Sequence, residues 1–315
     1  MLDDGGPFVG CHSDQSTLTR RRDWPVTARS HGYSKHLHTV HNYHTVDGGS
    51  APCRYAIHPS IQRTRVMQGP STRPHNRLLQ ALEPGAFARI APKLKPIGLA
   101  TRDTVYKPGE HIRRVYFPED AVLCLLTVMT NGDTIESATV GREGASWISA
   151  AVGAPSMPCE TVVAIGGSAL TLSIDDLDAE LRENGHFRDV LTQYSHALLI
   201  ASLRTSACSG LHALSQRCAR WILTTLDRVE EDRFQVTHEL LASFLGVRRA
   251  SVSEVIEQFE RAGILSVRRG QIRVADRQQL IEQACECYGV IKDNYQQVGR
   301  RKEREERNGV RTQRS

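Results

Sequence analysis

Hydrophobic and polar residues follow a regular pattern only from about residue 76 onward. A short run with helical spacing, Arg77–Glu83, comes first and ends at Pro84 and Gly85. Up to about residue 174, short β-rich runs such as Arg114–Phe117 and Ala121–Thr130 then alternate with turns rich in Gly, Pro and Asn. Short strands separated by turns every ~8–12 residues predict an all-β barrel or sandwich in this part of the chain.

A long helical pattern follows, from about Phe187 to Val229, and we expect Gly210 to interrupt it. Apolar and small residues recur along it at intervals of three and four. Such a stripe either packs on the chain's own core or forms a seam between two chains, since Ala, Ser and Thr let helices approach closely. In the second interpretation the dimer seam consists of Leu191, Tyr194, Leu198 and Ala201.

The most specific spacing in the chain begins at His238. Counting that residue as one, the fifth is Ala242, small enough for two helices to cross closely. The ninth is Gly246, which adopts the left-handed conformation at least cost. Val252 and Val255, the fifteenth and eighteenth, would point back into the core that the two helices share. This spacing predicts a helix-turn-helix.

The flanks of this motif agree with it. Thr237 is expected to cap the first helix, and Gly263 lies where the second helix would end. Beyond it, Ile264–Val274 reads as two short strands around Arg269 and Gly270. The prediction is therefore a winged helix-turn-helix.

The second helix of such a unit enters the major groove of double-stranded DNA with its N-terminal residues facing the base edges. Arg can pair bidentately with guanine, Glu can accept from cytosine, and Ser suits phosphate oxygens. The wing arginines would contact the phosphate backbone. The candidate DNA-binding residues are Thr237, Arg248, Arg249, Ser251, Ser253, Glu254, Arg268 and Arg269.

Composition and charge narrow the class of protein. The chain has 315 residues, of which 40% are hydrophobic and 24% charged, and this is ordinary globular composition with room for two domains. The net charge of +5 comes from the two ends, since residues 1–75 hold nine Lys/Arg against five Asp/Glu and residues 288–315 hold eight against four. A DNA site in the central body must therefore be a local patch.

Residues 1–75 hold eight of the 13 histidines and show no helical or strand period. We expect this stretch to be disordered, and a metal-binding tail is a minor alternative. Met67 is a candidate for the true start of translation, in which case the preceding residues are not translated.

Several functional classes are not expected. The longest predominantly apolar run, Ala121–Met129, is about half of the ~20 residues that span a membrane, and the first residues lack an apolar signal region. We therefore expect a cytoplasmic protein with no membrane partner. Nucleophile motifs, metal-protease helices and phosphate loops are lacking, so neither an enzyme nor a cofactor is expected.

The eight cysteines form no disulfide framework, and free thiols are expected. Cys208 and His212 lie one helical turn apart, while Cys285 and Cys287 flank Glu286. These four residues could join in a metal or redox site, although small buried side chains are the commoner role of Cys. We therefore assign no metal site to them from the sequence.

The β-rich segment, the long helix and the winged helix-turn-helix together resemble the cyclic-AMP receptor/Fnr (Crp/Fnr) family of bacterial transcription regulators. The resemblance covers about residues 76–298. Besides the helix-turn-helix, the segments that carry the resemblance are Tyr106–Glu110, Arg217–Trp221, Phe259–Ile264, Arg268–Asp276 and Ala284–Tyr288. The resemblance implies an α+β fold: a double-stranded β-helix sensor of the cyclic-nucleotide-binding type (a β-roll), a dimerisation helix and a winged helix-turn-helix. It also implies a homodimer on a two-fold-symmetric operator, with RNA polymerase as a further partner.

The recognition helix departs from the family at two places. Arg249 and Glu254 match base-reading positions, but Glu254 stands where family members often carry Arg, and Ala250 replaces a Glu. The DNA sequence that relatives recognise therefore does not carry over to this chain.

The predicted sensor departs further from the family pattern than the recognition helix does. Gly141–Gly144 resembles the start of the nucleotide phosphate site, but Pro158–Thr161 takes the place of its Arg-Ser/Thr pair. No Lys or Arg occurs in residues 145–171, while Glu160 adds negative charge. A buried phosphate without a cation is costly, so we expect an effector other than cyclic AMP, whose identity stays open.

These observations predict a dimeric, sequence-specific transcription regulator, with a redox- or metal-sensing regulator or a non-DNA adaptor as alternatives. The expected segments are a disordered tail at 1–75, the sensor at 76–186, the dimerisation helix at 187–209, the DNA-binding domain at 210–280 and a C-terminal helix with a basic tail at 281–315.

Overall fold

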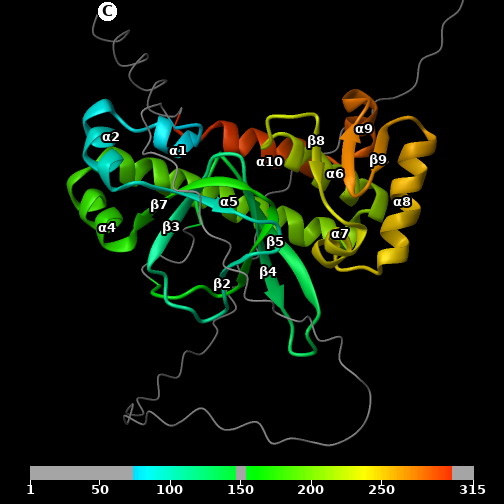
Figure 1. The fold of residues 1–315 in the computed structure, drawn as a ribbon, viewed down its shortest axis with the longest axis horizontal. Helices are drawn as coiled ribbons and strands as arrows, with labels where there is room; N and C mark the ends of the chain where they lie inside the picture. Colours follow the sequence, from blue (N-terminus) through cyan, green and yellow to red (C-terminus); the bar gives the residue numbers. More distant parts are fainter. Residues whose placement is uncertain (1–73, 147–153, 300–315) are drawn as a thin grey trace, which may run out of the picture. The chain divides into compact units, whose positions relative to one another are not determined.

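The computed structural model describes residues 74–146 and 154–299 (Figure 1). The expectations for the His-rich tail, for Met67 and for the basic end of the chain thus fall almost entirely outside the described residues. The first elements are α1 (Arg77–Gln80), α2 (Pro84–Ile90) and the 3-10 turn η1 (Ala91–Lys93). Asn76 fixes α1 because its side-chain oxygen caps the helix while its amide donates to the backbone oxygens of Pro118 and Gly144.

Two antiparallel sheets form the N-terminal β-rich domain, as the β-rich runs predicted, and this domain is called the sensor below after its expected role. One has the order β1-β7-β3 and the other β2-β6-β4-β5. Their strands are β1 (Lys95–Leu99), β2 (Thr104–Tyr106), β3 (Arg114–Pro118), β4 (Val122–Val128), β5 (Thr134–Val140), β6 (Glu160–Ile165) and β7 (Gly167–Ser173). The α+β class with a β-roll followed by a long helix is confirmed.

Strand β4 is buried on both of its faces, which explains its continuous apolar run. Leu123 and Leu125 belong to the core of the sensor. Val122, Cys124 and Leu126 belong to a second core, which is shared with the DNA-binding domain. Because successive side chains of a strand point to opposite sides, this one strand joins the two cores.

The long helical region consists of α4 (Ile174–Glu183), α5 (Gly185–Leu211) and α6 (Leu214–Leu226). The prediction that Gly210 interrupts the helix is wrong, since α5 runs through it and stops at Leu211. A single glycine costs a helix only about 1 kcal/mol. The break lies instead at His212 and Ala213, which both have extended backbone, and Gln216 caps the next helix by accepting from the Ala213 amide.

The predicted dimer seam is also wrong. Leu191, Tyr194, Leu198 and Ala201 are all buried in the chain's own sensor core. The Tyr194 hydroxyl donates to the Ala145 oxygen at 2.9 Å, and its ring stacks on Tyr295. A three-four stripe marks any helix with one buried face, so the pattern alone does not distinguish the chain's own core from a partner.

The C-terminal part holds a helix-turn-helix and a small sheet. Its elements are β8 (Arg233–Gln235), α7 (His238–Leu245), α8 (Arg249–Arg261), β9 (Leu265–Arg268), β10 (Gln271–Val274), α9 (Arg277–Gln283) and α10 (Cys287–Gln296). Trp221 anchors its core between Phe234 and Phe244. The last helix, α10, returns to pack along α5 (Figure 1). None of the described helices combines the length and apolar character needed to cross a bilayer.

Candidate nucleic-acid interface and the junction behind it

The turn of the helix-turn-helix has the geometry that its sequence predicts. Thr237 caps α7 by accepting from the Leu240 amide at 3.2 Å. Gly246 ends that helix in the left-handed region, with φ of 63°. A Cβ at Gly246 would lie 3.0 Å from the Ile135 side chain, so both the conformation and the space favour glycine here.

Helix α8 is held from behind by the residues that the spacing identified. Val252 and Val255 are buried together with Ala242. After Ala262 the chain turns at Gly263, whose φ of 74° is the left-handed conformation typical of a helix C-terminus. The opposite side of the helix therefore remains exposed.

The wing is a β-hairpin, as predicted. Strands β9 and β10 pair antiparallel around Arg269 and Gly270, which have φ of 51° and 76°. Two consecutive left-handed residues form the tight turn that suits the twist of a hairpin. This geometry leaves Arg268 and Arg269 exposed at the wing tip.

Two groups of exposed arginines thus flank the candidate DNA surface. Arg248 and Arg249 lie at the start of α8, and Glu254 follows about one turn later. In the described part of the chain, no carboxylate forms an ion pair with either of these arginines or with the two on the wing. Their charges are therefore free to meet phosphate or base edges.

Three of the candidate residues are less exposed or already engaged. The Ser253 hydroxyl donates to the Arg249 oxygen and lies 2.9 Å from His238 Nδ1, so it ties α8 to α7. The Thr237 hydroxyl caps α7 and also accepts from Arg102 at 3.2 Å. Ser251 is half-buried.

Behind this surface lies a buried polar junction that the sequence analysis did not identify. Glu136 of β5 accepts from the Trp221 indole N–H at 2.6 Å, and Arg220 lies 3.8 Å from its other oxygen. Burial raises the pKa of Glu136 above its usual value, while Arg220 and the indole N–H oppose that shift. Alternating strand positions and helical spacing give no signal that residues 85 positions apart, such as Glu136 and Trp221, will meet.

A second buried ion pair strengthens the same junction. Arg228, just after α6, lies 2.6 Å from Glu143, and it also donates to the Thr139 oxygen. A Cβ at Gly141 would overlap the Arg228 side chain, so glycine is needed for this approach. The carboxylate in the loop that resembles a nucleotide site is thus already paired within the chain.

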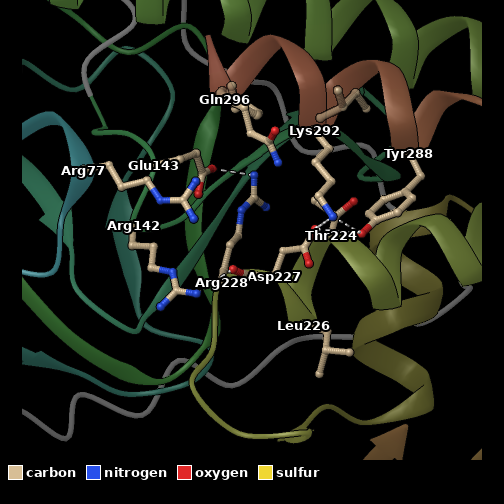
Figure 2. Close-up of a pocket in the computed structure, with 12 residues that line it drawn as sticks. Arg77, Arg142, Glu143, Thr224, Leu226, Asp227, Arg228, Tyr288, Lys292 and Gln296 are labelled. Atoms are coloured by element: carbon tan, nitrogen blue, oxygen red, sulfur yellow. Dashed lines mark hydrogen bonds and ion pairs between the residues drawn. The ribbon is translucent and has the colours of Figure 1, made fainter. Parts of the chain in front are cut away.

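A cavity of about 340 Å³ opens beside this pair (Figure 2). Figure 2 shows Glu143 facing Arg228 on one side, with Lys292 directed toward Asp227 and Tyr288 on the other. The cavity is lined by Arg77, Arg142, Glu143, Thr224, Leu226, Asp227, Arg228, Tyr288, Ile291, Lys292, Tyr295 and Gln296. Its walls come from the sensor, from the end of α6 and from α10.

Comparisons with known proteins identify the C-terminal part. The family model of the Crp-like helix-turn-helix domain matches residues 216–283, which run from α6 through the wing to α9. A comparison with curated protein sequences finds no match.

Solved structures share the fold at low sequence identity. A CRP-family transcriptional regulator from Thermus thermophilus is 19% identical with a TM-score of 0.50, covering 59% of this chain and 95% of its own. FixK2 from Bradyrhizobium japonicum is 16% identical with a TM-score of 0.47, covering 61% of this chain and 98% of its own. Residues 216–283 therefore form a Crp-like helix-turn-helix domain, and the chain shares the fold of the Thermus regulator.

Proposed function

We propose that this regulator binds a specific double-stranded DNA operator as a homodimer and responds to an effector other than cyclic AMP. The observation that carries the DNA-binding part is the arrangement of Arg248 and Arg249 at the start of α8 with Arg268 and Arg269 at the wing tip. All four are exposed and unpaired within the described chain. A helix N-terminus in the groove with a wing along the backbone combines base reading with phosphate contacts.

The dimer in this proposal uses the exposed face of α5 rather than the buried one. Leu199 and Leu203 are 56% and 62% exposed, which is unusual for leucines on a helix within a folded unit. The exposed residues of this face recur at alternating intervals of four and three, as in a two-chain seam. They are Thr192, His196, Leu199, Leu203, Ser206 and Gly210.

Dimerisation sets the expected geometry of the operator. Two recognition helices related by a two-fold axis enter successive major grooves about 34–36 Å apart. The operator is then two-fold symmetric, with half-sites roughly one helical turn apart. RNA polymerase is the protein partner that this mode of action implies.

The effector part of the proposal rests on charge. Residues 145–171 hold no Lys or Arg, and Glu143 is bound to Arg228. Calorimetry with cyclic AMP is expected to show no binding. A micromolar dissociation constant with a matching rise in Tm would contradict this part of the proposal.

The proposal as a whole is tested by selecting genomic fragments that bind the full chain, followed by footprinting on the enriched sequence. A symmetric footprint with two half-sites is expected. If the chain is instead an adaptor whose winged helix binds protein, no fragment is enriched and no electrophoretic shift is seen. The double variant Arg248→Ala/Arg249→Ala serves as the negative control, because it removes charge from an exposed surface without touching the core.

A further inference from the structure

Four side chains that could bind a metal converge at the break between α5 and α6. Cys208 lies in the last turn of α5 and His212 directly follows that helix. Cys285 precedes α10, and Cys287 is its first residue. The Sγ atoms of the three cysteines and one ring nitrogen of His212 all lie within 4.8 Å of one another.

The separations suit a single tetrahedral ion. Cys208 Sγ lies 3.5 Å from Cys285 Sγ, and Cys287 Sγ lies 3.7 Å from His212 Nδ1. Zinc with bonds of ~2.3 Å to sulfur and ~2.0 Å to nitrogen places its ligand atoms about 3.5–3.8 Å apart. Ligands this close leave no room for a polynuclear iron–sulfur cluster, whose metal and sulfide atoms must fit between them.

The fourth ligand is oriented by a neighbouring carboxylate. His212 Nε2 lies 3.2 Å from Glu286 Oε1. A carboxylate that accepts from one ring nitrogen of a histidine directs the other nitrogen to the metal, and this arrangement is the usual one around zinc-bound histidines. Here the nitrogen left free is Nδ1, the one that faces Cys287.

The cysteines are not simply part of the apolar core. Cys208, Cys285 and Cys287 are buried but form a cluster of their own, apart from the two large apolar cores. By contrast, Cys124 and Cys218 are packed within the second of those cores. Arg220 interacts electrostatically with Cys208 and would offset the excess negative charge of three thiolates around a divalent ion.

We propose that Cys208, His212, Cys285 and Cys287 bind one zinc ion, which fastens the start of α10 to the end of α5. Three cysteines and one histidine are a usual ligand set of closed structural zinc sites. The site would fix the hinge where the long helix meets the DNA-binding domain. Although no metal was assigned from the sequence, the fold brings together residues 77 positions apart. The proposal does not depend on DNA binding and would hold equally for an adaptor.

The first test measures metal in the full chain, purified without a metal-affinity tag under reducing conditions. Elemental analysis is expected to find about one zinc per chain. Because the His-rich N-terminal segment could also bind metal through nitrogen, the zinc is then exchanged for Co²⁺. A tetrahedral thiolate site gives Co²⁺ d–d bands together with a sulfur-to-metal charge-transfer band. Histidine ligands alone do not give the charge-transfer band.

Variants assign the signal to residues. Cys285→Ser and Cys208→Ser are expected to lose the charge-transfer band and most of the bound zinc, whereas Cys285→His, which keeps a ligand, should retain zinc. Cys218→Ser is the matched control, since Cys218 is equally buried but lies outside the cluster, and it should keep full metal content.

Two results would overturn the proposal. One is a full chain that retains no stoichiometric zinc and shows no thiolate band with Co²⁺, whether its cysteines are free or Cys208 and Cys285 are joined in a disulfide. The other is a Cys285→Ser variant with unchanged zinc. The measurement on the unmodified chain decides the matter even if a variant fails to fold.

Discussion

The candidate DNA surface and the junction behind it use arginine in opposite ways. On the surface, Arg248 and Arg249 are exposed and without ion-pair partners in the described chain. At the junction, Arg220 and Arg228 are almost fully buried and face Glu136 and Glu143. The first arrangement leaves positive charge available for a ligand. In the second, the charge is neutralised by buried ion pairs that join the sensor to α6 and to the residues that follow it. The same residue type is therefore exposed and available for binding in one region and has a structural role in the other.

The largest effect is expected from breaking the junction. Replacing Glu143 by Gln leaves the buried Arg228 without its counter-charge, and the removal of one partner of a buried pair costs about 3–5 kcal/mol. Urea unfolding followed by circular dichroism measures the loss. Glu239→Gln is the matched control, because Glu239 lies 3.6 Å from Arg102 in a pair that is half exposed on both sides, where an ion pair contributes about 0–1 kcal/mol. Equal losses in the two variants would contradict the comparison.

The two faces of α5 offer a second contrast. Leu198→Ala removes a side chain buried in the chain's own core, so a loss of about 2–5 kcal/mol in unfolding free energy is expected. Leu199→Glu combined with Leu203→Glu changes only exposed positions and should convert dimers to monomers in sedimentation equilibrium. Burial of each Leu contributes about 1.5–3 kcal/mol, so the dimer dissociation constant should rise at least tenfold. An unchanged dimer would show that the seam lies elsewhere.

A smaller effect is expected from the recognition helix. Arg249→Ala should cost about 1–3 kcal/mol on the operator and relax the preference at one base pair, since a bidentate contact to guanine is lost. Competition binding on the operator and on scrambled DNA measures the ratio of the two affinities, which should fall. Stability should stay within about 0.5 kcal/mol, because Arg249 is exposed. Equal weakening on both DNAs would mean that Arg249 contacts phosphate instead.

The smallest effect is expected at the wing tip. Arg268→Ala should weaken binding to both DNAs alike and lower the slope of log affinity against log salt by about one, because one phosphate contact is lost. A salt titration on operator and scrambled DNA tests this expectation. If the wing substitution alone changes base preference, the roles of Arg249 and Arg268 are reversed.

Local features of the sequence were sufficient for the DNA-binding domain. Gly246 adopts its left-handed conformation, Thr237 caps α7, and Arg269 with Gly270 forms the hairpin turn, each as predicted. These features depend on interactions within a few residues, so the residue types at fixed spacing specify them. The strands of the sensor were predictable as well, because they are separated by turn residues, which are also local signals.

What the sequence by itself determined is therefore the order of elements and the helix-turn-helix with its wing, which the match to a Crp-like helix-turn-helix domain supports. Only the tertiary structure decided which face of α5 is covered, which glutamate meets which arginine, and that Cys208 and His212 meet Cys285 and Cys287. A stripe of apolar residues shows that a helix has a buried face but not what covers it. Pairing between residues far apart in the chain depends on how whole elements pack, and no local spacing encodes that.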